Sequence, residues 1–477
     1  MPKTFYRFRT INNLIGEYNE LDNQSIYFAH PEQLNDPMEG FRDVYWSGDL
    51  IIWKNLFKHY LLCLERLSRL FIIASEELPI SKDDIPIFSG IDDFPTPQYK
   101  ELFIKISESF FSHENIINFI NKISFRSTPI RRDELFFYLN TIHPIALETI
   151  FNVYEESSLI PPNRTKNTNA YKILDDLLKA DFIGGLEKLL NEQNREEKIV
   201  NTLFSVQKNI HHQMDIIRLY NGLINSSTKN KNLLLVDFSN VYIKQLEKLI
   251  YPNWYTACFM SDCSNSSVWG HYGDNHSGVC LMFKSEAEGE GEDLFLNLEG
   301  INGWGNEGAI YGFRKRKFYP IDYIKGYGSI DFFRSLGTLP IPKLNSTWYF
   351  HEGQMSNCAE NMLHSEQEWR DNYWNNFYRD ITVKSKDWEY EKEYRLILNN
   401  MGGSFSEKEN RVLKYNFESL EGLIFGINTR SEDKANIIKI IEKKCKEHDR
   451  KDFKFFQAYY SSEKKCIDFT EMSLLKF

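Results

Sequence analysis

The sequence predicts an α+β protein in which a mixed β-sheet domain is interrupted by a long helical insertion. Three observations predict this class. Residues near the N-terminus alternate in character as in a strand, apolar residues recur at helical spacing from about residue 49 to 250, and short β-like runs return after residue 251. We therefore expect residues 1–48 to supply the N-terminal strands of the mixed domain, 49–250 the helical insertion, and 251–477 the main part of the mixed domain.

The N-terminal strands precede a turn-rich stretch. Phe5–Arg9 alternates aromatic and basic residues, as a half-buried strand does, and Ser25–Ala29 is a second short β-like run. In the stretch that follows, Asn35-Asp36-Pro37 is a strong turn signal, because the residue before a proline avoids the helical region. This turn either caps local amides or reaches over a ligand, and Glu39 could contribute to the same pocket.

Helical periodicity dominates the insertion. Two sets of apolar residues recur three or four positions apart, as residues on one face of a helix do. The two sets are Ile52, Leu56, Tyr60, Leu64 and Leu67, and Leu135, Leu139, Ile142 and Ile145. The insertion holds no catalytic motif that we recognise.

The C-terminal half returns to β character. The expected strands are Tyr255–Met260, Gly278–Phe283, a long strand within Val383–Asn399, a buried strand in Leu420–Ile427, and Phe453–Tyr459. A helix from Ser431 to about Lys446 separates the last two strands. These last three elements predict a β-α-β unit.

The composition bounds the class of protein. Of the 477 residues, 42% are hydrophobic and 26% are charged, which is typical of a globular protein rather than a disordered one. A net charge of −10 argues against a general affinity for nucleic acid, yet it leaves room for a local basic pocket. No run reaches the roughly 18 apolar residues of a membrane helix, and the 7 scattered cysteines fit a reduced compartment. We expect a cytoplasmic protein with no membrane partner.

Three groups of motifs carry a resemblance to a known family. They are Tyr27-Phe28 through Asn35-Asp36-Pro37-Met38-Glu39, then Cys258-Phe259 through Trp269-Gly270-His271-Tyr272 and His276-Ser277-Gly278, then Trp388-Glu389-Tyr390-Glu391-Lys392-Glu393-Tyr394-Arg395. In this order they resemble the bacterial domain-of-unknown-function family number 2971, over about residues 4–45 and 254–470. The family name supplies no activity, so the chemistry has to be argued from the residues.

The acidic motif is the most informative of the three. If Glu389 to Arg395 forms a strand, then Glu389, Glu391, Glu393 and Arg395 line one face, because side chains alternate between faces. One interpretation is an exposed strand face with an Arg–Glu pair. The other is a polar pocket in which one carboxylate does chemistry, since neighbouring carboxylates shift each other's pKa values.

A Glu-x-Glu on a late strand also resembles the ADP-ribosyltransferase fold. That resemblance implies NAD as co-substrate, with an early Arg7 or Arg9 on the pyrophosphate, a middle Tyr27 or Ser261, and a late glutamate that stabilises the ribosyl centre as nicotinamide leaves. It implies Glu393, Glu391 and His271 as catalytic residues. The implied cofactor-binding residues are Arg7, Arg9, Tyr27, Asn35, Asp36, Tyr272 and Arg395.

Two other patterns have competing interpretations. Cys258, Cys263, His271, His276 and Cys280 are all capable zinc ligands, but Cys258 and Cys280 lie in apolar runs where a free cysteine behaves as a buried hydrophobe, so we predict no metal. His271 either bonds a backbone carbonyl or faces a pocket as a ligand contact or an acid–base group. The basic run Arg314–Lys317 is either a solvated edge strand or a phosphate contact.

Three functions are compatible with these patterns. The first is an ADP-ribosyltransferase-like enzyme that uses NAD or another nucleotide, modifies a protein or nucleic-acid acceptor, and serves as a toxin or anti-phage effector. The second is a non-catalytic sensor or interaction module that binds a ligand or a protein partner. The third is a metal-dependent hydrolase of a nucleotide or nucleic acid, with the metal held by the carboxylates. The first two differ in whether the polar residues converge on one cleft.

Overall fold

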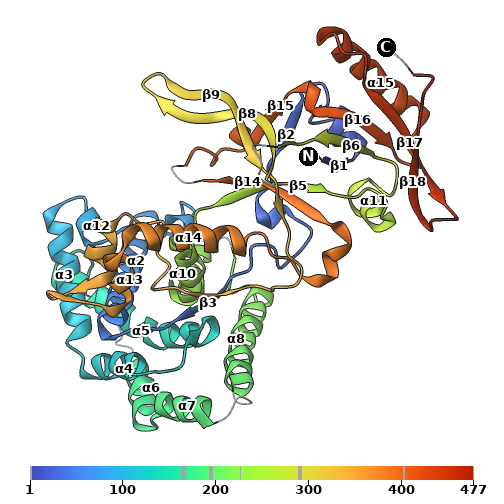
Figure 1. The fold of residues 1–477 in the computed structure, drawn as a ribbon. Coiled ribbons are helices and arrows are strands. Elements are labelled where there is room, and N and C mark those ends of the chain that lie inside the picture. The colour runs from blue at the N-terminus through green and yellow to red at the C-terminus, as the bar shows by residue number, and fades with distance from the viewer. Residues whose placement is uncertain are drawn as a thin grey trace. The chain divides into compact units, whose positions relative to one another are not determined.

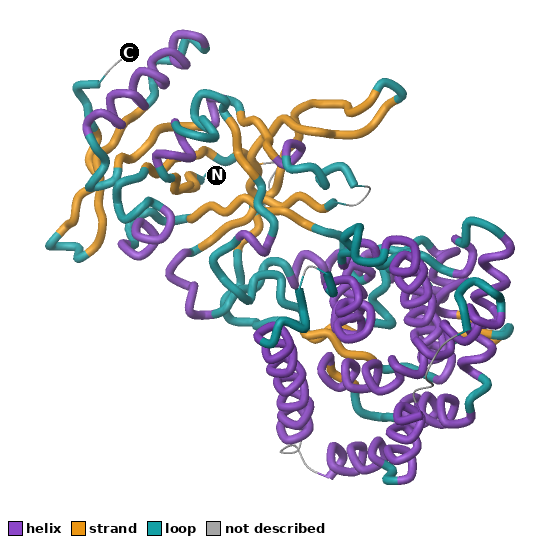
Figure 2. Tube along the Cα trace, turned by 180° about the vertical axis from the view of Figure 1, so that it is seen from behind, coloured by secondary structure: helices purple, strands orange, loops and turns teal. Residues whose placement is uncertain are grey.

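The computed structural model describes residues 3–162, 168–192, 197–225, 227–287, 293–400 and 403–475. The chain forms two compact units, and the α+β class that the sequence predicts is confirmed. One unit, here called the β unit, comprises Met1–Phe41, Pro252–Gly328 and Phe377–Phe477. The other, the helical unit, comprises Arg42–Tyr251 and Ser329–Asn376. Figure 1 follows the chain through both units, and Figure 2 separates their strands and helices by colour.

The unit boundaries differ from the divisions drawn on the sequence. Ser329–Asn376, which the sequence pattern places with the mixed domain, clusters with the helical unit. The reason is packing: β11 (Ser329–Asp331) pairs with β3 (Asp43–Trp46), and Phe333 meets Trp53 edge-to-face at 5.2 Å. The chain therefore contributes two separate segments to the helical unit, residues 42–251 and residues 329–376. Local periodicity in the sequence does not indicate the second contribution.

The β unit is built on an eight-stranded sheet. Its order is β10 (Tyr319–Pro320), β14 (Glu393–Asn399), β5 (Trp254–Met260), β1 (Thr4–Arg9), β6 (Val279–Lys284), β16 (Leu420–Phe425), β17 (Lys454–Ser461) and β18 (Cys466–Glu471). All neighbours are antiparallel except β16 and β17, which are parallel and joined by α15 (Ser431–Glu447). This crossover confirms the predicted β-α-β unit.

A second sheet packs against the first. It contains β2 (Ser25–Tyr27), β15 (Val412–Tyr415), β8 (Leu294–Gly305) and β7 (Glu286–Ala287), and β9 (Gly308–Lys317) pairs with β8. Phe5 and Phe259 of the first sheet share a buried core with Leu298 and Leu413 of the second. Arg314 and Lys315 are exposed on β9, as a solvated strand would have them.

Helix α11 (Ser266–Tyr272) belongs to a second, smaller core of the β unit. Its buried residues Val268 and Trp269 pack with Phe8 of β1, and Trp269 meets Phe8 edge-to-face at 4.9 Å. Asn265 begins the helix by accepting hydrogen bonds from the backbone amides of Ser267 and Val268. The short α1 (Ile11–Ile15) begins at Thr10 in the same way.

The helical unit is centred on two long helices, α2 (Leu50–Ala74) and α5 (Arg132–Glu156). The predicted apolar sets on both helices are buried, which confirms the periodicity. The other helices are α3 (Pro97–Phe111), α4 (Glu114–Ser124), α6 (Thr168–Lys179), α7 (Phe182–Glu192), α8 (Glu197–Tyr220), α9 (Lys229–Asn232), α10 (Phe238–Leu246), α12 (Ile341–Lys343), α13 (Glu360–His364) and α14 (Glu366–Asp380). Short strands β4 (Ile130–Arg131), β12 (Phe350–His351) and β13 (Gln354–Met355) complete it.

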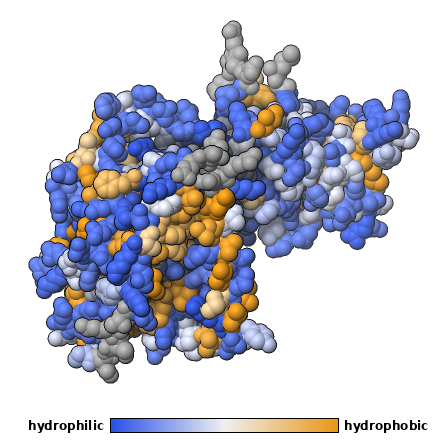
Figure 3. Space-filling model, turned by 90° about the horizontal axis from the view of Figure 1, so that it is seen from below, coloured by the Kyte–Doolittle hydropathy of each residue, from blue (hydrophilic) through white to orange (hydrophobic). Residues whose placement is uncertain are grey.

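The surface of the helical unit is partly apolar. Helix α8 leaves Leu203, Ile210 and Ile217 about half exposed, at 48%, 55% and 51%. Figure 3 views the chain from below and shows apolar residues gathered into open patches. In the described ranges, none of the helices combines the length and the apolarity that crossing a bilayer requires.

Candidate functional site

A cavity of about 340 Å³ in the β unit opens where β1 and β5 separate. β1 pairs with β6 along its whole length, but only Tyr6 and Met260 are register partners between β1 and β5. Beyond that pair the strands diverge, and Arg7 and Arg9 from β1 and Cys258 from β5 line the resulting space. The volume lies at the small end of the range usual for ligand pockets.

The predicted site residues largely converge on this cavity. The lining includes Arg7, Arg9, Tyr27, Asn35, His271, Tyr272, Glu393 and Arg395. Of the ten residues singled out in the sequence, only Asp36 and Glu391 do not line it. Segments from near the two ends of the chain therefore build one polar hollow, even though residues 42–251 intervene between them.

Asp36 has a structural position in the turn. Its carboxylate accepts a hydrogen bond from the backbone amide of Met38 at 2.9 Å, and its carbonyl accepts one from Glu39 at 3.0 Å. The turn thereby directs Glu39 towards Arg395. The capping interpretation of Asn35-Asp36-Pro37 is the one that these hydrogen bonds favour.

Arg395 is the centre of a buried charge cluster. Its guanidinium donates to both oxygens of Glu39 at 2.6 and 2.7 Å and to Glu393 at 2.8 Å, and it also donates to the carbonyl of Ile381 at 2.9 Å. Arg395 and both glutamates are almost fully buried. Such a cluster is held together only because each charge has a hydrogen-bonded partner.

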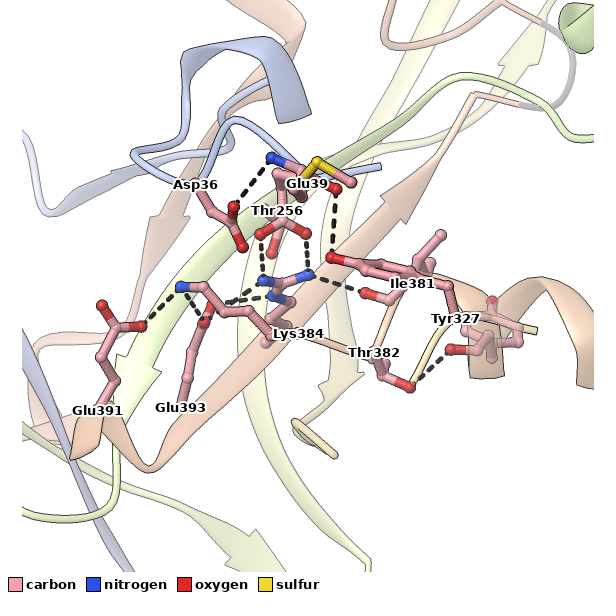
Figure 4. Close-up of polar contacts among 12 residues, drawn as sticks. Asp36, Glu39, Thr256, Tyr327, Ile381, Thr382, Lys384, Glu391 and Glu393 are labelled. Carbon is pink, nitrogen blue, oxygen red and sulfur yellow. Dashed lines mark hydrogen bonds and ion pairs between the residues drawn. The ribbon is translucent and has the colours of Figure 1, made fainter. Parts of the chain in front are cut away.

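Lys384 is the member of this cluster that the sequence did not reveal. Its ammonium donates to Glu391 at 2.7 Å and to Glu393 at 3.2 Å, so it lies between two carboxylates (Figure 4). Tyr272 donates to the other oxygen of Glu391 at 2.7 Å, which connects that carboxylate to the cavity wall. Lys384 lies in a polar stretch of sequence, where a lysine is expected to be solvated. No local pattern distinguishes a solvated lysine from a buried one.

The prediction that Glu389, Glu391, Glu393 and Arg395 line one face of a single strand is wrong. Residues Lys386–Glu391 form a 3₁₀ helix, Lys392 takes a left-handed conformation with φ of 47°, and β14 begins only at Glu393. The backbone amide of Lys392 donates to the carbonyl of Glu389 at 3.2 Å, which closes the turn and breaks the extended alternation. Glu389 is exposed, and Glu391 and Glu393 meet through Lys384 rather than through a strand face.

The two carboxylates beside Lys384 have pKa values displaced in opposite directions. Burial alone would raise the pKa of Glu393, but Arg395 and Lys384 outweigh it and lower that pKa to about 2. Burial raises the pKa of Glu391, which Lys384 opposes and the neighbouring Glu393 charge reinforces. Glu393 is therefore a fixed negative charge at neutral pH, whereas Glu391 is the one suited to exchange a proton.

Arg7 is a buried cation without a carboxylate partner. It is 6% exposed and donates to the backbone carbonyls of Cys258 at 3.1 Å and Tyr27 at 3.4 Å, and its Nε has no hydrogen-bond partner. Across the described ranges no carboxylate lies within ion-pair distance of it, whereas Arg9 is paired with Glu20. Burial and the Arg9 charge lower the pKa of Arg7 to about 10, so it stays positive at pH 7. Arg7 thus brings to the cavity a positive charge that has no ion-pair partner in the described chain, although the Glu20 charge acts on it from a distance.

His271 lies at the exposed end of α11, next to two aromatic side chains. Its Nδ1 is 3.2 Å from the hydroxyl of Tyr390, and its ring is 6.3 Å from that of Trp388. Among the described residues, no backbone carbonyl accepts a hydrogen bond from His271. Its position at the cavity rim suits a ligand contact.

The five potential zinc ligands do not gather. In the part of the chain that the structure describes, the one set of three metal-capable side chains within 4.8 Å of one another is His211, Asp215 and Asp237 of the helical unit. Burial raises the thiol pKa of both Cys258 and Cys280 well above the usual range, so these two are protonated hydrophobes. Lys384 also occupies the space between Glu391 and Glu393 where a metal held by both would lie.

Comparison with known proteins adds a family and no activity. The family model described as "Protein of unknown function (DUF2971)" matches residues 268–396, which include most of α11, Lys384, Glu391, Glu393 and Arg395. Neither the curated proteins nor the solved structures gave a match to the chain. Of the longer resemblance over 4–45 and 254–470, the match covers this central part. Residues 268–396, with the buried acidic cluster at their C-terminal end, are thus the part of the chain that is similar to this family.

Proposed function

We propose that the β unit is an ADP-ribosyltransferase-like enzyme that binds NAD or a related nucleotide in the cavity between β1 and β5. One observation carries the proposal: a buried cation without an ion-pair partner in the described chain, Arg7, and a permanently ionised carboxylate, Glu393, line the same cavity. Dinucleotide cleavage at the ribose needs both, a positive group for the phosphates and a negative group for the ribosyl centre.

Arg7 takes the phosphate role in this proposal. A guanidinium with an unused Nε and no carboxylate partner in the described chain is suited to a pyrophosphate, because its positive charge attracts the anion and its Nε–H can donate a charge-assisted hydrogen bond. Arg9, Arg395 and Lys384 already pair with Glu20, Glu39 and Glu391. The anion is therefore assigned to Arg7 rather than to Arg9.

Glu393 takes the role of stabilising the reacting sugar. The bond from the ribose C1′ to the nicotinamide nitrogen breaks, and its electron pair leaves with nicotinamide. The positive charge that develops at C1′ is stabilised by the Glu393 carboxylate, which needs no deprotonation because its pKa is already low. The acceptor oxygen or nitrogen then bonds to C1′ and loses a proton.

We assign that proton to Glu391. Its pKa is raised, and Tyr272, which lines the cavity, donates a hydrogen bond to it. The proton passes to the Tyr272 oxygen while the Tyr272 hydroxyl proton passes to Glu391, so the tyrosine ends neutral. Glu391 thus acts as a general base through a relay, without itself lining the cavity.

Release of nicotinamide tests the enzyme proposal. Purified protein is incubated with NAD and the free nicotinamide is quantified. Wild type is expected to release it, and Glu393→Gln is expected to slow the release by roughly 10²-fold or more. The matched control is Glu134→Gln in the helical unit, which also neutralises a buried glutamate paired with an arginine, Arg126. No release by wild type, or equal release by wild type and Glu393→Gln, contradicts the proposal.

The same purified protein distinguishes the non-catalytic sensor from the enzyme. The buried cluster of Arg395, Glu39 and Glu393 could serve purely to fix the cavity wall, in which case the nucleotide binds and is not cleaved. Calorimetric binding of NAD together with no nicotinamide release selects the sensor. The metal-dependent hydrolase has no comparable support, because the Lys384 ammonium fills the position between Glu391 and Glu393.

A cytoplasmic enzyme that consumes NAD, or modifies a protein or nucleic-acid acceptor, would be suited to act as a toxin or anti-phage effector. Induced expression of the wild type in a bacterial host is then expected to arrest growth, and expression of Glu393→Gln at equal level is not. Equal growth in both cultures argues against this role.

A further inference from the structure

The helical unit contains a second cavity, of about 440 Å³, which is larger than the one in the β unit. Two helices form opposite walls with stripes of the same spacing. Positions 54, 55, 58, 59 and 62 of α2 face it, as do positions 103, 104, 107, 108 and 111 of α3. The remaining wall comes from Gly90, Ile91 and Ile117, the π-helix Leu344–Tyr349, and the turn that follows it.

One side of this cavity is positively charged. Lys54 and Lys58 lie one helical turn apart on α2 and are half-buried. Neither has an ion-pair or hydrogen-bond partner in the described chain. Burial lowers the pKa of Lys58, the Glu352 charge opposes this shift, and the Lys100 charge adds to it.

In the described chain the acidic side chains at the cavity form no ion pair with these lysines, although the Glu352 charge acts on Lys58 from a distance. Glu108 is exposed, and the side chain of Glu352 is 82% exposed and pairs at 3.8 Å with His351 rather than with a lysine. Burial and the two lysine charges lower the pKa of His351, which Glu352 opposes. At neutral pH the buried side of the cavity therefore carries the two ammonium charges.

The opposite side is apolar and partly open. Phe103 is fully buried behind the wall, whereas Ile104, Phe111 and Ile117 are only half-buried and face the space. Half-exposed branched and aromatic side chains grouped around a cavity are typical of a surface that receives an apolar body. The cavity thus has a cationic end and an apolar end.

Two polar groups at the cavity add to this picture. The Thr347 hydroxyl is buried and has no hydrogen-bond partner, and a Cβ on Gly90 would come within 2.2 Å of it. Asn55, which is 3% exposed, donates to the carbonyls of Trp348 at 2.6 Å and Phe350 at 3.0 Å, and so fixes the end of the π-helix that presents Thr347. The hydroxyl, which has no hydrogen-bond partner in the described chain, lies packed against Gly90 in the cavity wall.

We propose that this cavity, lined by Lys54, Lys58 and Thr347 on its polar side and by Ile104 and Phe111 on its apolar side, is a binding site for a small organic anion with an apolar body. The ligand's carboxylate or phosphate lies against the two ammonium groups, and its hydrocarbon or aromatic part covers the α3 and α4 side chains. The site lies wholly in the helical unit and is independent of the function proposed for the β unit.

Calorimetry with matched amphiphiles tests the proposal. The full chain is titrated with decanoate, decyl phosphate, decanol and decylamine, each below its micellar concentration. Decanoate, decyl phosphate or both are expected to bind saturably with one site, at least tenfold more tightly than decanol, and decylamine is expected not to bind. The two anions distinguish a carboxylate site from a phosphate site. No saturable binding of either anion, or equal binding of decanol, overturns the proposal.

Single substitutions locate the site. Lys58→Met keeps the length of the side chain and removes the charge, and it is expected to weaken anion binding at least tenfold. Lys105→Met makes the same change at an exposed position of α3 outside the cavity and is expected to have no effect. Equal weakening by both substitutions indicates diffuse charge attraction and contradicts a site.

Thermal unfolding shows whether a loss of binding reflects a folding defect of the variant. Lys58→Met removes an unpaired, half-buried charge, so its Tm is expected to equal or exceed that of wild type. If Lys58→Met does not fold, Lys54→Met is titrated in its place with the same expectation. Ser107→Leu, at a buried position of the cavity wall, is expected to abolish anion binding by filling space. Undiminished binding by Ser107→Leu overturns the assignment to this cavity.

Discussion

Arg395 holds Glu39 through two hydrogen bonds of 2.6 and 2.7 Å, although 356 positions separate the two residues in the chain. The pair ties the loop after β2 to the strand that carries Glu393. It therefore joins the N-terminal segment to the acidic motif through charge as well as through sheet pairing. The stability of the β unit and the shape of its cavity depend on the same contact.

Removal of Arg395 is expected to be strongly destabilising. Arg395→Met leaves Glu39 without its partner and Glu393 with only Lys384, so we expect the free energy of unfolding to fall by about 3–5 kcal/mol. Urea unfolding followed by tryptophan fluorescence measures it. The control Lys392→Met removes an exposed pair with Asp262 and is expected to cost less than about 1 kcal/mol. Similar losses for both variants would show that the cluster is not a structural element.

The stability of the β unit is expected to fall in acid through Glu393. Its folded-state pKa is lowered to about 2 from an ordinary value of 4.5, so its contribution is present above pH 4.5 and is lost as the pH falls towards 2. The contribution is on the order of 3 kcal/mol. Because other carboxylates also titrate in this range, the quantity to measure is the difference in Tm between wild type and Glu393→Gln. That difference should shrink between pH 4.5 and 2, and a constant difference contradicts the lowered pKa.

Arg7 is expected to affect nucleotide binding more than stability. Arg7→Met leaves no carboxylate of the described chain unpaired, because the guanidinium donates to two carbonyls and lies over the Phe259 ring, so the fold should survive while NAD affinity falls at least tenfold. Isothermal titration with NAD measures the affinity. Arg450→Met is the control away from the cavity, since Arg450 also donates to two carbonyls, of Phe417 and Leu420, and in addition pairs with the exposed Asp452. Unchanged affinity in Arg7→Met would remove the proposed phosphate contact.

Tyr272 is expected to tune the proton acceptor. Tyr272→Phe removes the hydrogen bond to Glu391, and losing a donor to a carboxylate raises its pKa further. Because Tyr272 also carries the proton in the relay, the maximal rate of nicotinamide release should fall, and the remaining activity should no longer show the acid limb that Glu391 produces. Tyr390→Phe, which removes the contact with His271 instead, should leave that limb in place. A profile unaltered in Tyr272→Phe excludes Glu391 as the base.

Local patterns in the sequence predicted a good part of this structure. The alternation in Phe5–Arg9 and the apolar runs at Tyr255–Met260 and Leu420–Ile427 gave strands where expected, because burial of one face imposes the period. These strands depend on short-range order that the residues themselves encode. The convergence of Arg7 and Glu393 on one cavity was instead implied by the resemblance that their motifs carry, because β5 lies between their strands in the sheet.

Other features depend on partners distant in the sequence. Lys384 is buried only because Glu391 and Glu393 surround it in the fold. The residues next to it in the sequence do not indicate this burial. The strand expected from Glu389 begins four residues late because Lys392 adopts a left-handed conformation, which lysine seldom does without tertiary contacts such as its ion pair with Asp262. The packing of residues 329–376 in the helical unit likewise depends on contacts that are distant in the sequence, such as the pairing of β11 with β3.

The central position of β1 in its sheet has a consequence for biogenesis. β1 lies between β5 and β6, so Tyr6 cannot meet Met260 until the ribosome has reached residue 260. This strand must wait, unpaired, while the helical segment emerges and begins to fold. Deleting it would divide the sheet into two unconnected halves. A variant that lacks Thr4–Arg9 is therefore expected to accumulate as insoluble aggregate rather than as a folded protein.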